Sequence, residues 1–571
     1  MTVTETPAPA APVIGQRLLR KEDPALLTGE AKYTSDLDIP GALFLAVARS
    51  PHAHARIVSI DTSAAAAMPG VVAVYNGADL RDAWAAPMPC AWPVTDDMKN
   101  PVHYPLAIDT VCYAGDGVAV VLAVSDAIAH DAIDAIDVQY EVLEAVLDLE
   151  DALSDRVVIH DELGTNRSYT WALKVEGTEG AVDEALANAA FTVSERYVQQ
   201  RLIPMAMESR AVAAVPQPFG GDITLYSATQ IPHILKIMSA ITLGIPEHQV
   251  RVIAPAVGGA FGSKLNVYAE EALALALARR LGRPVKWIED RQENYVATIH
   301  GRGVLHDCTL AGTEDGKILG LKFVELADMG AYFQLLTPGI PELGGWVYMG
   351  PYDVEAYWYE FTGIMTNATP TDAYRGAGRP EATYVIERLV DTFARRIGKD
   401  PAQVRRMNLH PPHADAQTSI MGLNVDSANY EPTFDRALEL AEYDLMRKEQ
   451  AARRESGDVR QIGIGLSSYI EMCGLAPSEI LGALRYVAGG WDAAEIECRP
   501  FGKVVVRTGT SPHGQGHDTS WSQIVADGLG ITPDDVGSCT ATRPCRASAW
   551  IRTGHGRPPS EARRSGRRSR R

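Results

Sequence analysis

The first 150 residues alternate short apolar runs with glycine, proline and polar turn positions. Runs of this length and β-branched composition predict strands, and they cover residues 71–74, 111–113 and 118–122. The whole stretch 117–124 is apolar but far shorter than the ~18 residues of a membrane span, so we expect a buried strand. A helix is expected over 127–135 and a further strand over 138–143. The pattern therefore predicts a small α/β domain over residues 16–150.

The rest of the chain predicts a connecting segment and a large domain in two halves. Residues 151–190 are polar and turn-rich at first and then favour a helix over 182–190. The first half of the large domain is expected over 191–410. Two consecutive prolines at 411–412 and a polar stretch mark a boundary. A second half is expected over 430–536, and the predicted fold class is α+β.

One candidate ligand loop, the first glycine loop, covers residues 258–264 and reads Gly-Gly-Ala-Phe-Gly-Ser-Lys. It follows a predicted strand at 250–253, and Asn266 is expected to cap a helix over 267–281. Backbone amides exposed at a helix start bind anions. The loop is not a nucleotide P-loop, because its lysine follows the serine instead of preceding it. It also lacks the third glycine of a dinucleotide fingerprint.

Two further loops have similar chemistry. The second glycine loop (residues 514–519) follows a predicted strand at 504–506 and precedes a helix expected over 520–529. The arginine loop (residues 372–382) reads Asp-Ala-Tyr-Arg-Gly-Ala-Gly-Arg-Pro-Glu-Ala. Its glycines let the backbone approach a ligand closely, and its guanidinium groups suit an anionic or oxo-bearing group. The three loops together predict a ligand site.

Charge and cysteine usage narrow the function classes. A net charge of −19 over 571 residues argues against nucleic acid or an anionic membrane as the partner of the main body. The seven cysteines are scattered without a CxxC pair, which predicts neither a zinc ribbon nor an iron–sulfur cluster in this chain. No secretory signal or membrane span is evident, so we expect a cytoplasmic protein.

The segment 538–571 differs from everything before it. It contains ten arginines, no lysine and one glutamate, and it has no hydrophobic period. It has three interpretations: a disordered basic tail, a nucleic-acid-binding arm, or an out-of-frame translation of GC-rich DNA. We favour the frameshift, because the composition changes abruptly inside a predicted helix-to-strand segment.

The motifs occur together and in order. Ser227-Ala228-Thr229-Gln230, the first glycine loop, the arginine loop and the second glycine loop resemble the signature of the molybdenum hydroxylase large subunits. This is the family of xanthine dehydrogenase, aldehyde oxidase and aerobic carbon monoxide dehydrogenase. Strings at 22–29, 49–57 and 105–107 resemble its N-terminal hammerhead domain. The resemblance implies an α/β hammerhead domain followed by a split molybdopterin-binding domain whose second half is incomplete.

The resemblance also implies a cofactor and the residues that bind it. The cofactor is molybdenum on a molybdopterin cytosine dinucleotide, held by the pterin dithiolene, so that no side chain ligates the metal. Gln230 is implied to hydrogen-bond an oxo group on the metal. The implied contacts from the three loops are Gly259, Ala260, Phe261, Gly262, Arg375, Gly376, Gln515, Gly516, His517 and Thr519.

Departures from the family pattern bear on the substrate. Leu265 stands where purine-hydroxylating members carry a substrate-orienting glutamate, and Ala377 stands where they carry an aromatic residue; both are implied substrate-pocket residues. No cysteine lies between Cys308 and Cys473. The copper-binding cysteine of true aerobic carbon monoxide dehydrogenases is therefore missing, and AYRGAGR resembles the form II sequences. The small-molecule substrate is expected to be an aldehyde or a nitrogen heterocycle.

The catalytic residue stays unknown, because the family's general-base glutamate would lie beyond the end of this chain. Glu208, Glu270, Glu271 and Glu471 are other acids near the motifs, and Glu270 and Glu271 are expected to be helix-surface or capping charges. The resemblance implies electron transfer through a [2Fe–2S] small subunit and an FAD-binding medium subunit, in a dimer of heterotrimers. A truncated, non-catalytic remnant of such a subunit is the alternative.

Overall fold

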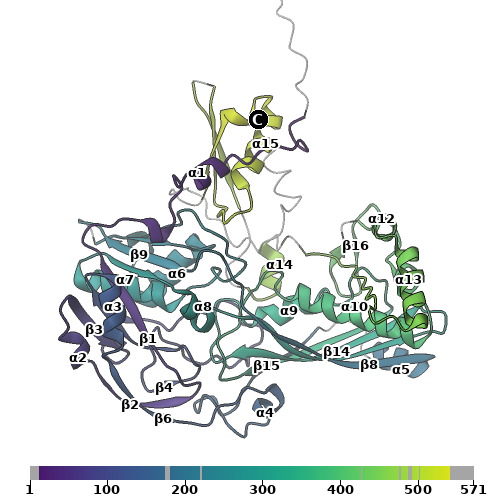
Figure 1. Cartoon of the computed structure of the whole chain (residues 1–571), viewed down its shortest axis with the longest axis horizontal. Helices are drawn as coiled ribbons and strands as arrows, with labels where there is room; N and C mark the ends of the chain where they lie inside the picture. The colour runs from purple at the N-terminus through teal and green to yellow at the C-terminus, as the bar shows by residue number, and fades with distance from the viewer. Residues whose placement is uncertain are drawn as a thin grey trace, which may run out of the picture.

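The computed structural model of the protein describes residues 12–173, 180–218, 221–425, 427–472, 474, 478–486, 492–500 and 502–540. Figure 1 shows an N-terminal lobe in purple and teal, a long curved sheet with its helices, and a small C-terminal unit in yellow. The N-terminal segment lies against the C-terminal unit, although the two are far apart in sequence (Figure 1).

A seven-stranded sheet runs through the N-terminal lobe in the order β11-β10-β9-β12-β1-β5-β3. Strand β1 (Leu43–Arg49) pairs in parallel with β12 (Val285–Ile288), so strands from before and after residue 150 share one sheet. Strand β5 (Gly117–Ala123) is buried at every position, which confirms the strand predicted for this apolar run. The other members are β3 (Val71–Asn76), β9 (Ala211–Pro216), β10 (Ile223–Ser227) and β11 (Val250–Ile253).

A three-stranded sheet, β4-β2-β6, completes the lobe. Its strands are β2 (Ala55–Asp61), β4 (Thr110–Val111) and β6 (Asp137–Val142). Helix α3 (Asp126–Ile133) packs on β1 and β5, and the Ser125 hydroxyl oxygen accepts a hydrogen bond from the Ile128 amide at its start. The helix and strand predicted over 127–143 therefore form close to their expected bounds.

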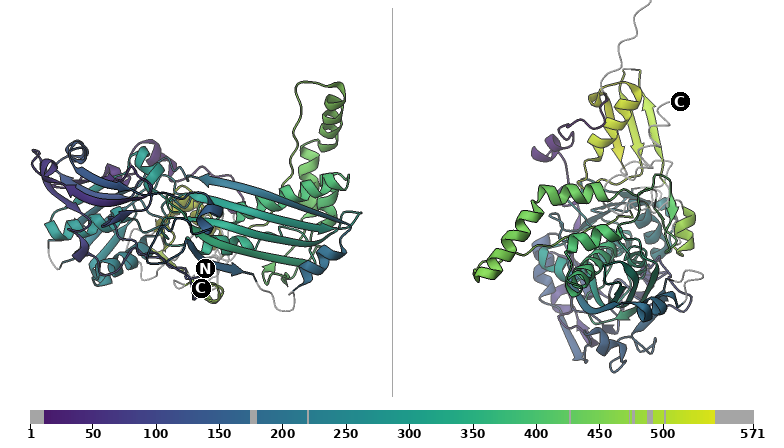
Figure 2. Two further views of the ribbon diagram at one scale, coloured as in Figure 1. Left: turned by 90° about the horizontal axis from the view of Figure 1, so that it is seen from below. Right: turned by 90° about the vertical axis from the view of Figure 1, so that its right-hand side faces the viewer.

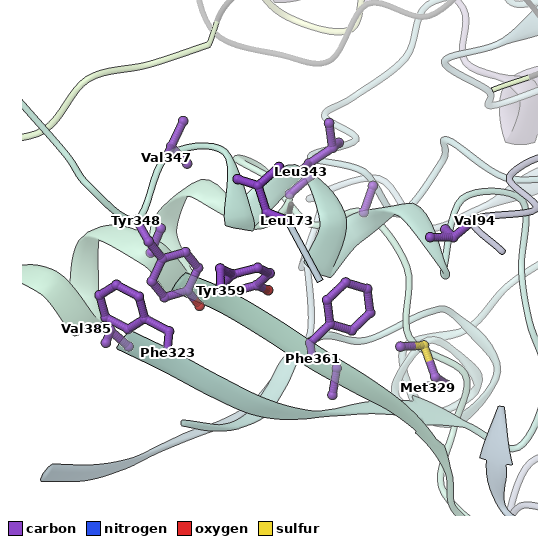
Figure 3. Close-up of a cluster of buried hydrophobic side chains, with 14 of the residues drawn as sticks. Val94, Leu173, Phe323, Met329, Leu343, Val347, Tyr348, Tyr359, Phe361 and Val385 are labelled. Atoms are coloured by element: carbon purple, nitrogen blue, oxygen red, sulfur yellow. The ribbon is translucent and has the colours of Figure 1, made fainter. Parts of the chain in front are cut away.

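A five-stranded sheet forms the long part of the molecule, in the order β7-β15-β14-β13-β8. Its strands are β7 (Arg167–Ala172), β8 (Phe191–Leu202), β13 (Gly301–Gly312), β14 (Ile318–Gly330) and β15 (Ala356–Met365). Helices α9 (Gly339–Gly345) and α10 (Arg379–Arg396) cover one face. Figure 3 shows the aromatic core between these helices and the sheet, with Phe323, Tyr348, Tyr359 and Phe361 in contact.

Trp92 fastens a loop of the N-terminal lobe to this core. Its side chain is 2% exposed, and its indole N–H donates to a Glu342 carboxyl oxygen at 3.0 Å and to the Leu484 carbonyl at 2.9 Å. Burial raises the pKa of Glu342 to about 8, and the hydrogen bond from Trp92 offsets part of that rise. The folded chain therefore holds a proton on Glu342 where an unfolded chain would lose it.

The C-terminal unit has its own sheet and core. Strands β18 (Ala494–Cys498), β19 (Val504–Thr508) and β20 (Val536–Thr540) form the sheet. Helix α15 (His517–Leu529) packs on it through Val525 and Ala526. The helix begins three residues before the expected position 520, because Gly516, with φ 76°, starts it directly after the loop. Strand β20 includes residues 538–540, and residues 541–571 lie outside the described residues.

The remaining elements connect these parts. Helices α12 (Glu431–Leu440) and α13 (Tyr443–Ser456) project from the end of the long sheet (Figure 2). The other helices and strands are α1 (Asp23–Leu27), α2 (Ser63–Ala66), α4 (Leu149–Leu153), α5 (Ala181–Asn188), α6 (Pro232–Leu243), α8 (Arg291–Ala297), α11 (Pro401–Asn408), α14 (Ser478–Ala483), β16 (Gln417–Thr418) and β17 (Asn424–Val425). Within the described ranges, no helix has the length and apolar character needed to cross a membrane.

Helix α7 (Ala269–Leu281) corrects two expectations about the first glycine loop. It begins at residue 269, with Tyr268 as N-cap and Glu271 accepting a hydrogen bond from the Tyr268 amide at 2.9 Å. Asn266 is not the cap, because its side-chain oxygen accepts from the amides of Val267 and Leu335. Those bonds tie the loop to the turn after β14.

Glu270 and Glu271 are both buried, so the expectation that they are surface charges is wrong, although Glu271 does cap the helix. The Glu270 carboxylate pairs with Arg49 at 2.7 Å and with Arg210 at 2.8 Å. Burial opposes the ionisation of Glu270, but Arg210 and Arg49 outweigh it and hold its pKa at about 2. Helical periodicity could not reveal partners that lie some 60 and 221 positions away.

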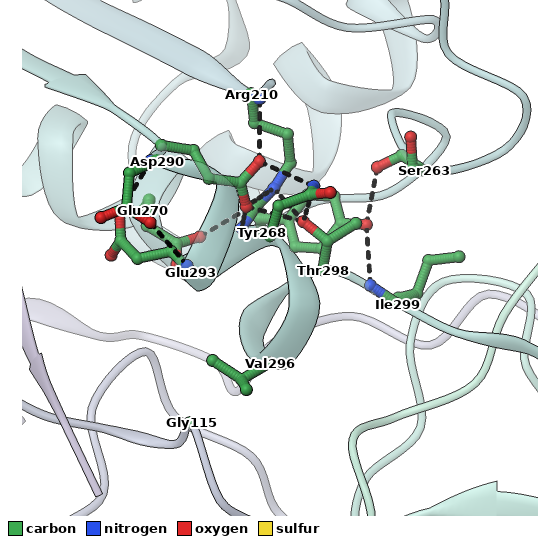
Figure 4. A network of polar contacts seen from close by, with 12 residues as sticks. Gly115, Arg210, Ser263, Tyr268, Glu270, Asp290, Glu293, Val296, Thr298 and Ile299 are labelled. Atoms are coloured by element: carbon green, nitrogen blue, oxygen red, sulfur yellow. Dashed lines mark hydrogen bonds and ion pairs between the residues drawn. The ribbon is translucent and has the colours of Figure 1, made fainter. Parts of the chain in front are cut away.

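These pairs belong to an ion cluster that joins Arg49, in the domain predicted over residues 16–150, to the part of the chain that follows it. Figure 4 shows the contacts around Arg210 and Glu270. Arg210 also donates to Glu289 at 2.7 Å and to the Thr298 hydroxyl at 2.8 Å. Arg49, on β1, also pairs with Glu293 at 2.9 Å. Each buried charge in this cluster has an opposite charge beside it, as buried ions require.

We expect Arg210→Met to lower the free energy of unfolding by about 3–5 kcal/mol, because it leaves buried carboxylates without a counter-charge. The measurement is chemical denaturation followed by circular dichroism. Arg196→Met is the matched control, since the Arg196–Asp307 pair is about half exposed (49% and 51%) and its loss should hardly move the midpoint. Equal effects of the two variants would contradict the role given to the cluster.

Glu342 should make stability depend on pH. Because its folded pKa is raised, its contribution is complete below the unfolded pKa near 4.3 and is lost as pH rises towards 8. The slope is at most about 1.4 kcal/mol per pH unit. We expect Glu342→Gln to gain melting temperature relative to wild type as pH rises from 5 to 8. Exposed Glu314→Gln should track wild type, and parallel curves for all three proteins would refute the assignment.

Candidate functional site

The first glycine loop follows β11 and interlocks with the arginine loop. Phe261 and Gly262 have φ values of 55° and 101°, and the first is rare for a non-glycine residue. A Cβ atom at Gly262 would lie 1.8 Å from the carbonyl oxygen of Ala373, so only glycine fits there. The Arg375 amide donates to the Phe261 carbonyl at 2.9 Å. Two motifs more than a hundred residues apart in sequence are thus joined through their backbones.

Gln230 joins the same centre from the end of β10. Its side-chain oxygen accepts from the Gly262 backbone amide at 3.0 Å, and its backbone N–H donates to the Lys264 carbonyl at 2.9 Å. Pro232, two residues later, begins α6 and fixes the chain direction beyond Gln230. The structure therefore brings together Gln230, the first glycine loop and Arg375, which the sequence placed in one site.

Arg302 supports the arginine loop from β13, and the sequence analysis missed it. Its guanidinium donates to the carbonyls of Tyr374 and Arg375 at 3.2 and 2.9 Å and pairs with Glu381 at 3.1 Å. Its positive φ of 64° is unusual inside a strand. The Arg375 side chain is exposed and lies 5.8 Å from the Phe261 ring, measured from its guanidinium carbon to the ring centroid.

The second glycine loop approaches this centre from the C-terminal unit. The His513 and Gln230 side-chain nitrogens are 3.5 Å apart, and the Ser511 hydroxyl lies 3.5 Å from the Thr229 carbonyl. Gln515 is exposed, and its side-chain oxygen accepts from the His513 amide at 2.7 Å. These two contacts of Ser511 and His513 with Thr229 and Gln230 are therefore at the long limit of hydrogen bonding.

Three predicted residues of the second loop are buried: Gly516, His517 and Thr519. The Thr519 hydroxyl donates to Glu22 at 2.6 Å and accepts from the Lys21 amide at 2.8 Å. The ring of His517 lies 5.6 Å from that of Trp521, between centroids. The Thr519 proton is thus directed at the N-terminal segment, a neighbour that the loop sequence gave no sign of.

The two implied pocket residues are buried beside the loops. Leu265 is 3% exposed and packs in the main core, while its amide donates to the Gly262 carbonyl at 2.8 Å. Ala377 is 4% exposed, has a positive φ of 42° and donates its amide to the Tyr374 carbonyl at 2.7 Å. Both positions therefore add apolar surface next to the loops and no charge.

Glu208 and Lys264 close the first glycine loop into a ring. One Glu208 carboxylate oxygen accepts from the Gly258 amide and from the Lys264 ammonium, each at 2.7 Å, at the two ends of the loop. Burial lowers the pKa of Lys264, whose side chain is 1% exposed, and Glu208 offsets part of that effect. No local pattern predicts this pair, because the two residues are 56 positions apart.

The other acids near the motifs are also engaged. Glu471 pairs with Arg379 at 2.9 Å. Glu271 accepts from the Ser227 hydroxyl at 2.6 Å, and burial raises its pKa to about 7. Burial likewise raises the pKa of Asp372, the first residue of the arginine loop, to about 7. Among the described residues, no cluster of three or more histidine, cysteine, aspartate or glutamate side chains could hold a metal ion.

Family models match three consecutive parts of the chain. The aldehyde oxidase and xanthine dehydrogenase a/b hammerhead domain matches residues 28–144. Molybdopterin cofactor-binding domains match residues 159–409 and 436–542. The fold and the site thus define a hammerhead domain followed by two molybdopterin-binding halves, as the resemblance implied.

Individual proteins similar to this chain belong to the same family as the matched domains. The carbon monoxide dehydrogenase large chain of Hydrogenophaga pseudoflava is 36% identical over 537 residues, which are 91% of this chain and 65% of the relative. The nicotinate dehydrogenase large molybdopterin subunit of Eubacterium barkeri is 30% identical over 409 residues, 70% of this chain and 89% of the relative. The crystal structure of quinoline 2-oxidoreductase from Pseudomonas putida 86 superimposes with a TM-score of 0.88 at 35% identity, covering 94% of this chain and 67% of that one.

The chain therefore belongs to the family of molybdopterin-binding large subunits of the molybdenum hydroxylases, which confirms the predicted family. The cofactor of these domains is molybdenum-molybdopterin. The chain spans 65% of the length of the carbon monoxide dehydrogenase relative.

We expect Glu208→Gln to destabilise the chain by about 3 kcal/mol, because it leaves the buried Lys264 ammonium unpaired. The double variant Glu208→Gln/Lys264→Gln should recover part of the loss, since it buries no unpaired charge. Denaturation of the wild type, both single variants and the double variant measures the coupling. Glu247→Gln, which breaks an exposed pair with Lys236, is the control. If the effects of the two buried substitutions were additive, the Glu208–Lys264 pair would not hold the loop closed.

Proposed function

We propose that this chain is the cofactor-binding catalytic subunit of a molybdenum hydroxylase. The observation that carries the proposal is the meeting of Gln230, the first glycine loop and Arg375, joined by the Gly262–Gln230 and Arg375–Phe261 hydrogen bonds of 3.0 and 2.9 Å. Three separate motifs meet at one point, and each presents backbone or polar groups there.

The residues present suit the proposed cofactor. Gln230 presents a side-chain amide nitrogen, and Arg375 presents an exposed guanidinium. The second glycine loop presents the side-chain amide of the exposed Gln515. Donors of this kind suit a group that bears oxo and phosphate oxygens. A Cβ atom at Gly514 would meet nothing within 4 Å, so this loop leaves open space beside it. We propose that the bound form is the molybdopterin cytosine dinucleotide.

The proposed contacts are divided between the halves. Gln230 and the main chain of Gly259, Ala260, Phe261 and Gly262 would approach the metal end of the cofactor. Arg375 and Gly376 would support it from behind. Gln515, Gly516, His517 and Thr519 would hold the pterin and its phosphate, with Thr519 acting through its backbone because its hydroxyl proton is committed to Glu22.

The proposed reaction hydroxylates a carbon atom with water. A substrate C–H and one water molecule become C–OH, with release of two protons and two electrons. The cofactor, when bound, supplies the two-electron redox centre. The chain's own residues orient the cofactor and line the apolar side of the pocket through Leu265 and Ala377, which favours an aldehyde or a nitrogen heterocycle other than a purine.

We assign no general base among Glu208, Glu270, Glu271 and Glu471, because each carboxylate already pairs with a neighbouring cation or caps a helix. We further propose that electrons leave to an FAD-binding medium subunit and a [2Fe–2S] small subunit in a cytoplasmic dimer of heterotrimers. The scattered cysteines support separate electron-transfer chains, since no cluster motif stands in this sequence.

The test compares molybdenum content, by mass spectrometry of the purified full chain, in wild type, Gln230→Ala and Gln217→Ala. Gln217 is an exposed glutamine at the end of β9 and serves as the matched control. We expect Gln230→Ala to retain about tenfold less molybdenum than the other two. Wild type without molybdenum, or equal content in all three, would refute the proposal. Turnover of quinoline and benzaldehyde with an artificial electron acceptor then distinguishes the substrate classes.

A further inference from the structure

The N-terminal segment lies across the C-terminal unit, as Figure 1 shows beside α15. The Val13 amide donates to the Asp527 carboxylate at 2.7 Å. The Gln523 side chain donates to the carbonyls of Val13 and Gln16 at 3.2 and 3.0 Å. An extended segment from the beginning of the sequence thus runs along one side of the last described helix.

Lys21 is the main fastening of this segment. Its ammonium donates to the Ser522 hydroxyl at 3.1 Å and to the carbonyls of Pro533 and Val536 at 2.7 and 2.5 Å. These three acceptors lie on α15, on the turn after it and at the start of β20. Burial lowers the pKa of Lys21, and Asp534, Asp518 and Glu22 partly offset this. One side chain therefore holds three elements of the C-terminal unit together.

The same segment also touches the second glycine loop. Glu22 accepts from the Thr519 hydroxyl at 2.6 Å, and Arg20 donates to the Gly514 carbonyl at 3.4 Å. A Cβ atom at Gly516 would come within 3.5 Å of Glu22 and 3.6 Å of Arg20. The loop is therefore packed against the segment through Gly514, Gly516 and Thr519.

The other end of the segment is fixed at the first glycine loop. Tyr33 forms a parallel bridge with Ala256, whose amide donates to the Lys32 carbonyl at 3.0 Å. Ala256 lies two positions before Gly258, and a Cβ atom at Gly258 would lie 3.2 Å from the Tyr33 ring. The segment thus connects the two glycine loops, whereas the direct contacts between the halves at Thr229 and Gln230 are 3.5 Å long.

We propose that residues 13–33 form a positioning strap that sets the spacing between the two glycine loops. The strap is a set of positioning residues and adds no group to the reaction. The proposal rests on the proposed function for its consequence, because a cofactor that contacts both loops requires them at a fixed separation. The fastening itself can be tested without a cofactor.

The test cuts the strap from the folded full chain. A protease site inserted between Gly29 and Glu30, both exposed, allows cleavage after folding. We expect the 1–29 fragment of wild type to stay bound during size-exclusion chromatography. Lys21→Met should release it at least about tenfold faster, because three hydrogen bonds to an ammonium are lost. Arg17→Met is the matched control, since Arg17 is an exposed cation within the same fragment.

Hydrogen exchange on the uncut chain separates positioning from general stability. Lys21→Met should speed amide exchange in residues 514–536 and leave α7 unchanged, whereas a general loss of stability would raise both. Immediate loss of the fragment from cleaved wild type, or wild-type release and exchange in Lys21→Met, would overturn the strap. Because neither readout needs a cofactor, the result stands whether or not the chain carries molybdenum.

Discussion

The buried pairing of Glu270 with Arg49 and Arg210 is the constraint on which the site depends. It fixes the first turn of α7 against β1 of the N-terminal lobe, with the carboxylate held ionised at a pKa of about 2. The adjacent Glu271 caps the same turn and accepts from Ser227, three residues before Gln230. A single helical turn therefore links the domain interface to the residues that meet the first glycine loop.

Backbone shape, more than side-chain chemistry, defines the centre of the site. Phe261 and Ala377 both have positive φ, and Gly262 has no room for a side chain beside Ala373. Such conformations persist only where neighbours enforce them. Here the Glu208–Lys264 ion pair and the Arg302 guanidinium do so. The loop sequences are specific because few residues satisfy these backbone demands.

Much of the fold could be predicted because its signals are local. The apolar run of β5, the serine cap of α3 and the strand before the first glycine loop each depend on residues close in sequence. The motifs likewise indicated that Gln230 and Arg375 share a site. What the sequence could not show are partners at long separation. The burial of Glu270, the pairing of Glu208 with Lys264 and the direction of the Thr519 hydroxyl all depend on tertiary contacts that no local pattern encodes.

The two halves of the site differ in how they are held. The first glycine loop is followed directly by residues of the two large cores, Leu265 and Val267, while the second belongs to a unit whose small apolar core includes Val504, Val525 and Val536. Among the described residues, no apolar cluster contains residues of both loops, so polar contacts set the distance between them. Hydrogen bonds are directional and short-ranged, so they fix a separation more sharply than apolar packing of equal strength. A site that must grip one extended ligand at both ends gains from that sharpness, and the N-terminal segment supplies it through Lys21 and Glu22.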